Sequence, residues 1–325
     1  MKGKIFKLSM VMLLSCICLV ALAKSDGSTV PTGKKVGTER PFKRIISLYG
    51  AHSENLFSLG LDKEIVGVSV NETYPPCALK KPVFSYHNDA EKFIAARPDL
   101  VLIRPMIARG YRNLILKLRE AGIRVVSLQP TTADGMYSYW RKLGTLTGRE
   151  NRAEEMVKRF REELMGIDLL VREIPHSRRK RVYFEAIHSR MKTFSQCSIA
   201  IFALKSAGGV NIADDADSVR GTNIAAYGKE RILSHADEID VYLAQTGTMN
   251  RIRTTNIVEE GGFKAIKAIK SGEVYTIDEK IVSRPTLRLL DGIHEISKIL
   301  YPEMFRNIDG PSGLKEDKER GVAVP

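Results

Sequence analysis

Residues 149–173 read RENRAEEMVKRFREELMGIDLLVRE, and this stretch decides how the rest of the chain is organised. Its apolar residues recur three or four positions apart, a spacing that places side chains on one face of an α-helix. They are Ala153, Met156, Val157, Phe160, Leu164, Ile167, Leu170 and Val171. Pro175 follows, and proline does not continue a helix. We therefore predict one long helix over residues 148–174, with a separate folded part on each side of it.

The part before this helix alternates between strand and helix patterns. Apolar runs predict strands at residues 44–48, 64–69, 99–103 and 124–128. Helices are predicted between them, one capped by Ser53 and ended at Gly60, one opened by a capping box at 88–91, and one at 110–121. Strands that alternate with helices predict βαβ units and a mostly parallel sheet.

The part after the long helix repeats this alternation. Strands are predicted at residues 182–187, 239–244 and 273–277, and helices at 198–207, 258–269 and 286–300. The predicted fold class is therefore α/β, with two Rossmann-like lobes joined by a single long α-helix. The predicted boundaries are residues 41–147 for the first lobe, 178–302 for the second lobe and 303–325 for a tail.

The two lobes also echo each other in their layout. Residues 97–104 read RPDLVLIR and residues 237–244 read DEIDVYLA. Each segment consists of a helix end, an acidic residue and an apolar strand. We interpret this as a loose architectural duplication rather than a sequence repeat.

The N-terminus has the three parts of a secretory signal peptide. Lysines at positions 2, 4 and 7 precede an apolar run that ends in Ala21-Leu22-Ala23. We predict that residues 1–23 are cleaved, that residues 24–40 form a flexible lead-in, and that the protein is periplasmic. Residues 13–16, LLSC, loosely resemble a lipidation site, but the apolar run continues past Cys16 and favours cleavage after Ala23.

Composition narrows the classes of function. The 325 residues are 43% hydrophobic with a formal net charge of +13, typical of a basic globular protein. Such a charge could favour an anionic ligand, although solvated surface lysine and arginine explain most of it, and no basic-aromatic motif indicates nucleic acid. Cys77 and Cys197 lie far apart in the sequence, so we predict two separate thiols.

The sequence lacks the motifs that are typical of several common enzyme classes. It contains no glycine-rich phosphate loop, no Gly-x-Ser-x-Gly elbow, no Cys-x-x-Cys and no His-Glu-x-x-His. This favours a binding protein over an enzyme. His52, His87 and His188 could still meet at a cleft and hold a divalent metal. A direct metal binder or a metallo-enzyme on the same scaffold therefore stays an alternative.

Four segments resemble a known family. Residues 44–69, 92–102, 143–150 and 228–233 are similar, in this order around one long helix, to class III periplasmic binding proteins. These proteins serve ABC importers for cobalamin, ferric siderophores and haem. The resemblance implies a monomer without catalytic residues or cofactor that holds its ligand between two lobes and delivers it to a permease dimer. It also implies that an exposed glutamate on each lobe, here Glu54 and Glu230, contacts permease arginines.

The ligand of such a fold meets loops at the carboxyl ends of the strands. Tyrosine, histidine and arginine side chains follow the predicted strands of both lobes. The first lobe supplies Tyr49, Tyr86, His87 and Arg104, and the second supplies His188, Arg190, Met191, Arg251, Arg253 and Arg284. Several arginines in one cleft would suit an anionic metal chelate. We therefore expect a ferric siderophore-like chelate, with haem and a corrinoid such as cobalamin as the alternatives.

Overall fold

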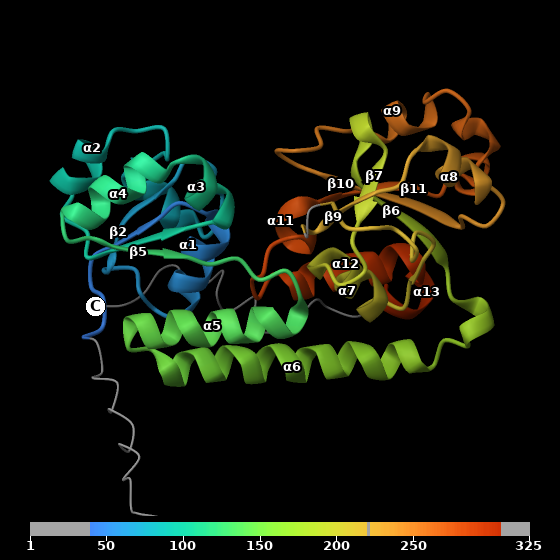
Figure 1. Cartoon of the computed structure of the whole chain (residues 1–325). Coiled ribbons are helices and arrows are strands. Elements are labelled where there is room, and N and C mark those ends of the chain that lie inside the picture. The colour runs from blue at the N-terminus through green and yellow to red at the C-terminus, as the bar shows by residue number, and fades with distance from the viewer. Residues whose placement is uncertain (1–39, 220–221, 307–325) are drawn as a thin grey trace, which may run out of the picture. The chain divides into compact units, whose positions relative to one another are not determined.

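The computed structural model describes residues 40–219 and 222–306, which contain two β-sheets (Figure 1). The first sheet contains β1 (Ile45–Ser47), β2 (Ile65–Ser69), β3 (Val83–Phe84), β4 (Leu100–Ile103) and β5 (Arg124–Ser127). Its order is β3-β2-β1-β4-β5 and all of its pairs are parallel, as the sequence predicts. The predicted signal peptide at residues 1–23, the lead-in except residue 40, and residues 307–325 of the tail lie outside the described residues.

The helices of the first lobe differ from the prediction in detail. They are α1 (Gly50–Ser58), α2 (Ala90–Ala95), α3 (Pro105–Gly110) and α4 (Arg112–Glu120). Ser53 lies inside α1 and donates to Glu72, so its predicted role as a cap is wrong. The predicted capping box is also wrong, because Asn88 Oδ1 accepts from the Ser85 backbone N–H. The helix predicted at 110–121 is divided from α3 at Tyr111.

The second sheet mixes parallel and antiparallel pairs. Its strands are β6 (Arg181–Ile187), β7 (Lys192–Phe194), β8 (Val210–Asn211), β9 (Ile224–Ala226), β10 (Val241–Thr246) and β11 (Val274–Asp278). The order is β11-β10-β6-β7-β9, with β8 paired to β6. The three predicted strands are the long parallel ones, β6, β10 and β11. The shorter β7, β8 and β9 carry too few residues to show an alternating pattern.

The helices of the second lobe are mostly short. They are α7 (Ile199–Ser206), α8 (Lys229–Ser234), α9 (Thr254–Val258), α10 (Lys267–Ser271), α11 (Glu279–Val282), α12 (Leu289–Leu300) and α13 (Pro302–Phe305). Ser198 caps α7 through its side chain, which agrees with the predicted start. The sequence also predicts that Gly261-Gly262 interrupts the helix at 258–269 early, and the structure is divided there, although α9 begins before this segment, at Thr254. Gly262, at φ +86°, separates α9 from a 3₁₀ turn and then α10, because a left-handed residue ends a helix.

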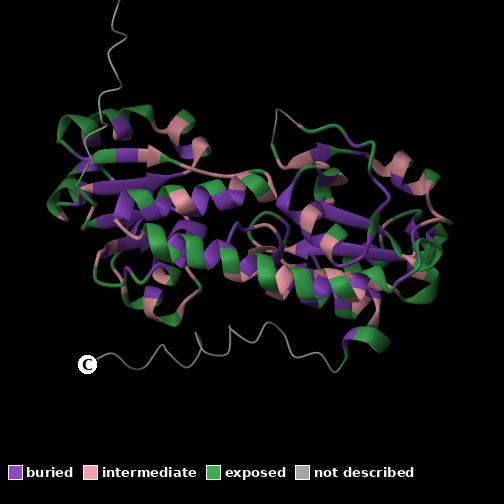
Figure 2. Cartoon of the chain, turned by 90° about the horizontal axis from the view of Figure 1, so that it is seen from below, coloured by how far each residue is buried: buried purple, intermediate pink, exposed green. Residues whose placement is uncertain are grey.

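A second helix runs beside the single long helix that joins the lobes. The long helix predicted at 148–174 is α6 (Glu150–Arg172), and α5 (Ala133–Thr147), which the sequence reading did not delimit, runs beside it (Figures 1 and 2). Gly148 makes the turn between them at φ +65°, a left-handed conformation that favours glycine. A Cβ at Gly144 would lie 2.7 Å from the Cβ of Ala153, so the two helices approach closely there.

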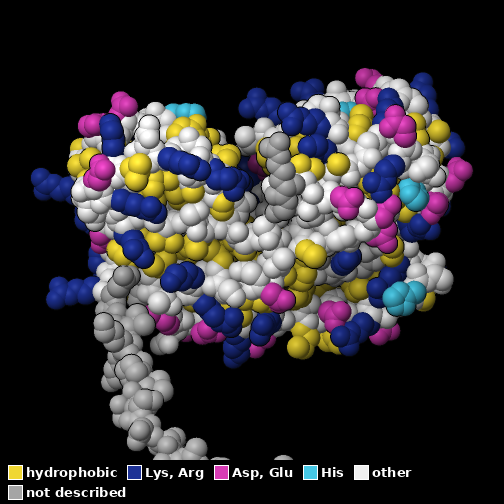
Figure 3. Space-filling model, viewed as in Figure 1, with side chains coloured by type: hydrophobic (Ala, Val, Ile, Leu, Met, Phe, Trp, Pro, Cys, Tyr) yellow, Lys and Arg dark blue, Asp and Glu magenta, His cyan; other side chains and the backbone are white. Residues whose placement is uncertain are grey.

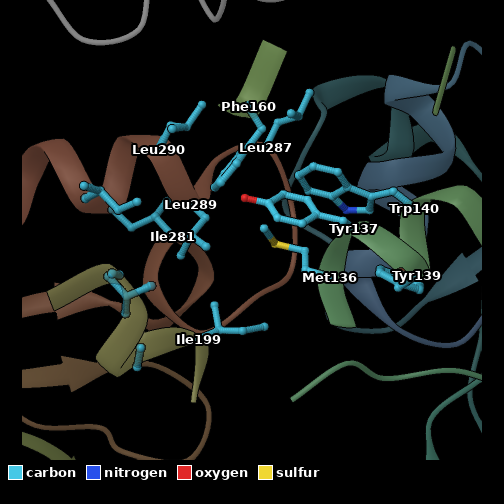
Figure 4. Packing of buried hydrophobic residues seen from close by; sticks show 14 of the residues in the cluster. Met136, Tyr137, Tyr139, Trp140, Phe160, Ile199, Ile281, Leu287, Leu289 and Leu290 are labelled. Carbon is cyan, nitrogen blue, oxygen red and sulfur yellow. The ribbon is translucent and has the colours of Figure 1, made fainter. Parts of the chain in front are cut away.

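One hydrophobic core connects this helix pair with the second lobe. Figure 4 shows Tyr137 and Trp140 of α5 lying near Phe160 of α6 and opposite Leu287 and Leu289. The Trp140 and Phe160 ring centroids are 5.4 Å apart in an edge-on arrangement. Because both lobes contribute to this core, separating them would expose large aromatic surfaces to water.

The predicted echo between the lobes is present in the structure. Asp99 precedes β4, and its carboxylate accepts from the Arg44 backbone N–H at the start of β1. Asp240 precedes β10 in the same way and accepts from the Arg181 backbone N–H at the start of β6. In each lobe an acidic residue therefore joins the opening strand to the neighbouring parallel strand.

One further sequence prediction can be compared with the described residues, and one property of their helices can be added. Cys77 and Cys197 are free thiols, as predicted, the first half-buried and the second exposed. Over residues 40–219 and 222–306, none of the helices has the length and apolar character needed to cross a membrane.

Candidate functional site

The first part of the site lies where β1 and β4 end. These strands are parallel neighbours, with Ser47 opposite Leu102, so the residues that follow them lie close together. Tyr49 follows β1 and Arg104 follows β4. The Arg104 guanidinium lies 4.5 Å from the centroid of the Tyr49 ring, a cation–π contact, and its Nε donates to Gln129 Oε1 at 3.0 Å. The structure thus brings together two residues that the sequence predicted.

Arg284 approaches the same place from the second lobe. It lies between α11 and α12 and is only 8% exposed. Its guanidinium packs against Gly50, where a Cβ would lie 2.4 Å from Nη1, so a larger residue at position 50 would displace the guanidinium. The next residue, Pro285, fixes the segment, because its carbonyl oxygen accepts from Asn55 Nδ2 at 2.9 Å and from Trp140 Nε1 at 3.0 Å.

These two arginines create a positive centre around Tyr49, and the carboxylates of Glu54 and Glu279 lie in its electrostatic surroundings. Across the part of the chain that the structure describes, neither Arg104 nor Arg284 forms an ion pair with a carboxylate. Burial raises the pKa of the Tyr49 phenol, although both arginines oppose the shift, so the ring stays neutral. Figure 3 shows further Lys and Arg side chains where the two lobes face each other. Arg284 is buried and Arg104 is half-buried, so a bound anion that reached both would form charge-assisted hydrogen bonds away from bulk water.

A second group in the first lobe is aromatic. Tyr86 and His87 follow β3, and Tyr111 separates α3 from α4. The Tyr86 ring centroid lies 4.5 Å from that of His87 and 4.7 Å from that of Tyr111, and the Tyr111 hydroxyl is 3.2 Å from His87 Nδ1. Tyr111 was not predicted as a site residue, because it falls inside the helix predicted at residues 110–121.

His188 lies in the turn after β6, and carboxylates face both of its ring nitrogens. Nδ1 is 2.8 Å from Glu185 Oε2, and Nε2 is 3.6 Å from Glu260 Oε2. The hydrogen bond to Glu185 and the charges of both glutamates raise the pKa of His188 against the effect of burial. Nδ1 is thus hydrogen-bonded to Glu185, whereas Nε2 lies beyond hydrogen-bond distance of Glu260.

The partner of His188 was not predicted. Glu185 is fully buried in β6, where its Oε2 also accepts from the Tyr242 hydroxyl at 2.5 Å and its Oε1 lies 3.4 Å from Asn250 Nδ2. Glu260 in turn binds Lys229 Nζ at 2.5 Å. The signal in the sequence was an acidic residue inside an otherwise apolar strand, three positions before a histidine.

The remaining candidates of the second lobe lie outside these groups. Arg190, Arg251 and Arg253 are exposed, and Met191 is half-buried in a left-handed conformation at φ 45°. Among residues 40–219 and 222–306, the guanidinium groups of Arg190 and Arg251 form no ion pair. The structure therefore leaves them free on the surface and does not join them to Tyr49 and Arg104.

The three histidines considered for metal binding occupy separate environments. His52 is buried, with Nδ1 2.6 Å from the Tyr139 hydroxyl and Nε2 3.2 Å from the Ile103 carbonyl oxygen. Burial lowers the pKa of His52 to about 4, so it is a neutral core residue. His87 is exposed beside Tyr111, and His188 is paired with Glu185. The described residues contain no group of three or more His, Cys, Asp or Glu side chains that could hold a metal ion.

The two glutamates predicted to be exposed, Glu54 and Glu230, differ in how far they are buried. Glu230 is exposed in the first turn of α8, as expected. The expectation of exposure is wrong for Glu54, which is 2% exposed because α1 packs against residues 284–288. Its Oε2 lies 3.8 Å from Arg288 Nη1. Burial raises the pKa of Glu54 to about 7, and the charge of Arg288 opposes this rise.

Comparisons with known proteins agree with this architecture. The family profile described as periplasmic binding protein matches residues 45–281. An uncharacterized ABC transporter substrate-binding lipoprotein, YvrC of Bacillus subtilis, is 27% identical, with 81% of this chain and 82% of that protein covered. A cobalamin-binding protein of Halobacterium salinarum is 24% identical, with 80% and 69% covered. The structure of a possible iron-binding (periplasmic solute-binding) protein from Staphylococcus epidermidis superimposes with a TM-score of 0.69 at 26% identity, with 81% and 100% covered.

Proposed function

Because this chain belongs to the periplasmic binding protein family, we propose that it captures an anionic metal chelate between its lobes and delivers it to a membrane permease. It is a non-enzymatic, substrate-binding component of an ABC importer. The basic and apolar segments of residues 1–23 support export, either after cleavage or, as in the lipoprotein relative, through a lipid anchor.

The positive centre around Tyr49 carries this proposal. Arg104 and Arg284 come from different lobes, and each lacks an acidic partner among the described residues. Guanidinium groups bind carboxylate and phosphate oxygens through paired hydrogen bonds. A ligand that offers such oxygens would supply the missing charge and would contact both lobes at once.

A ferric siderophore-like chelate suits this chemistry best. Such a chelate carries oxygen donors around its iron, and tyrosine and arginine line the positive centre. Haem is the first alternative, because the half-buried Tyr86 offers an oxygen and the exposed His87 offers a nitrogen. A corrinoid is the second, supported by the name of the Halobacterium relative. The single tryptophan, Trp140, is buried in the core and would give a corrinoid no aromatic wall.

The visible spectrum of the protein purified from cells grown in rich medium tests the proposal. We expect a broad charge-transfer band of a ferric chelate. A Soret band would identify haem, and corrin bands would identify a corrinoid, and either would replace the siderophore assignment. A colourless protein that carries stoichiometric zinc or manganese would refute chelate binding altogether.

Removing one charge of the positive centre tests its role directly. Arg284→Met keeps much of the side-chain volume but removes the guanidinium, and we expect the affinity for the chelate to fall by about 10- to 100-fold, the usual cost of a charge-assisted hydrogen bond. Arg251→Met is the matched control, since Arg251 is exposed, and should change affinity less than about twofold. Equal losses in both variants would show that overall charge, rather than this centre, attracts the ligand. Fluorescence titration gives both values.

Permease docking requires an exposed carboxylate on each lobe, and Glu54 is buried. The fold suggests which exposed carboxylate of the first lobe takes this role instead. In the second lobe, Glu230 is the second residue of α8, the six-residue helix before β10. In the first lobe, the six-residue helix α2 precedes β4, and its second residue is Glu91. Strands β4 and β10 occupy equivalent places beside β1 and β6. The Glu91 side chain is 73% exposed, so we assign docking to Glu91 and Glu230.

A further inference from the structure

Helix α8, which carries Glu230, is joined to the turn after β6 in two ways. The first is a main-chain hydrogen bond of 3.0 Å from the Gly228 N–H to the Met191 carbonyl oxygen. The second is a chain of charged side chains. Lys229 Nζ lies 2.5 Å from Glu260 Oε1, and Glu260 Oε2 lies 3.6 Å from His188 Nε2. Lys229 is the immediate neighbour of Glu230.

The other end of this chain is anchored inside the second lobe. Glu185, fully buried, holds His188 Nδ1 at 2.8 Å and the Tyr242 hydroxyl at 2.5 Å. Asn250 Oδ1 accepts from the His188 backbone N–H at 3.0 Å, which fixes the same turn a second time. A buried carboxylate must keep its partners, because losing one leaves an uncompensated charge. We therefore expect the turn that carries His188 and the buried Glu185 to move as one unit.

The turn lies at the carboxyl end of β6, the edge at which ligands of open α/β sheets bind. Glu260 is the only described carboxylate that pairs with both His188 and Lys229. A shift of the turn would therefore move Glu260 and pull on the first turn of α8. Arg231, the third residue of α8, is held separately by its ion pair with Asp215. The charged chain thus acts on the end of the helix where Glu230 lies.

From these contacts we propose that Lys229 and Glu260 are positioning residues that transmit ligand contact at the His188 turn to the docking carboxylate Glu230. This inference rests on the proposed function and adds a link between its two sites. The ligand shifts the turn, Glu260 follows His188, and Lys229 carries the displacement to α8. The permease then distinguishes the loaded protein from the empty one by the position of Glu230.

The test compares ligand affinity with permease affinity in the full chain. Ferric citrate, haemin and cyanocobalamin are titrated first, and the probe that binds the unaltered protein is used afterwards. Affinity for the permease complex in lipid nanodiscs is then measured with and without that probe. We expect Glu260→Gln and Lys229→Met to keep the probe affinity within about twofold and to lose most of a ligand-dependent gain in permease affinity of about tenfold, a typical coupling. Lys229→Arg should restore the gain.

Matched controls separate this role from general damage. Glu259→Gln removes the exposed neighbouring carboxylate, and Lys264→Met removes a nearby lysine, and both should keep the gain. The pKa of His188, followed by NMR, should fall in Glu260→Gln, because a negative charge that favours the imidazolium is gone, and should stay unchanged in Glu259→Gln.

Each other outcome decides against one of the two proposals. If the probe does not change the permease affinity of the unaltered protein, or if the Glu260→Gln and Lys229→Met variants keep the full gain, the link between the sites is refuted while the proposed function stands. A loss of the gain without any fall in the pKa of His188 in Glu260→Gln also refutes the link, because Glu260 would then act apart from His188. If none of the three probes binds the unaltered protein, the proposed function itself is refuted, and the link with it.

Discussion

Replacing both Glu91 and Glu230 with lysine is expected to abolish uptake of the ligand by cells, while the purified protein binds the ligand as tightly as before. Both carboxylates are exposed on short helices at equivalent places in the two lobes. Permease arginines would face lysines instead of carboxylates, and like charges at an interface cost several kcal/mol (roughly 3 or more). Cellular uptake and a fluorescence titration of the same variant measure the two effects.

The single variants show which lobe contributes which charge. Glu91→Lys and Glu230→Lys should each lower uptake strongly, because the proposed docking uses one carboxylate from each lobe. Glu155→Lys serves as the control, since Glu155 is an exposed carboxylate on α6, and uptake should be unchanged. Normal uptake by Glu91→Lys together with lost uptake by Glu230→Lys would contradict the assignment of Glu91. A loss of ligand affinity in either variant would contradict a pure docking role.

Replacing Glu54 with glutamine should remove a marked pH dependence of stability. The pKa of Glu54 is about 7 in the folded protein and 4.5 in its ordinary state, so folding binds a proton between these values. Stability from this group is therefore fully present below pH 4.5 and is lost as pH rises through about 7. From about pH 4 to about pH 8, the free energy of unfolding should fall by about 3 kcal/mol more in the unaltered protein than in Glu54→Gln.

Urea unfolding at a series of pH values measures this difference. Glu91→Gln is the control, because Glu91 is exposed, and its curve should run parallel to that of the unaltered protein. Parallel curves for Glu54→Gln as well would mean that Glu54 stays charged in the folded protein, held by Arg288. Only the buried Glu54 should couple folding to pH. The experiment therefore distinguishes Glu54 from the exposed Glu91.

Local patterns predicted the regular parts of the fold well. The strands β4 and β6 are continuous apolar runs, and α6 follows one helical face closely, so neighbouring residues carry the signal. The errors occurred where distant residues decide. Ser53 was predicted as a helix cap, but its hydroxyl donates to Glu72. Asn88 was predicted as part of a capping box, but its Oδ1 accepts from the Ser85 backbone N–H. A side chain with several possible hydrogen-bond partners chooses among them only in the folded chain.

The candidate site was predicted in its residue types more than in its arrangement. Tyr49 and Arg104 follow parallel neighbouring strands, and that rule alone brought them together. His188 was predicted as a ligand-binding residue, and in the structure its Nδ1 pairs with Glu185. Glu185 was not predicted, because it lies inside an otherwise apolar strand. The inward direction of Glu185 depends on Tyr242 and Asn250, which follow it by more than fifty residues.

The sequence by itself determined two α/β lobes, the long helix between them and the membership of a binding-protein family, because periodicity and short motifs are properties of neighbouring residues. Only the tertiary structure decided that a second helix, α5, runs beside that long helix, that Arg284 reaches Gly50, and that Glu54 is buried. The last two outcomes depend on the segment 284–288 packing against α1, which lies more than 220 residues earlier. Burial of a charge is set by what covers it, and no local pattern specifies that cover.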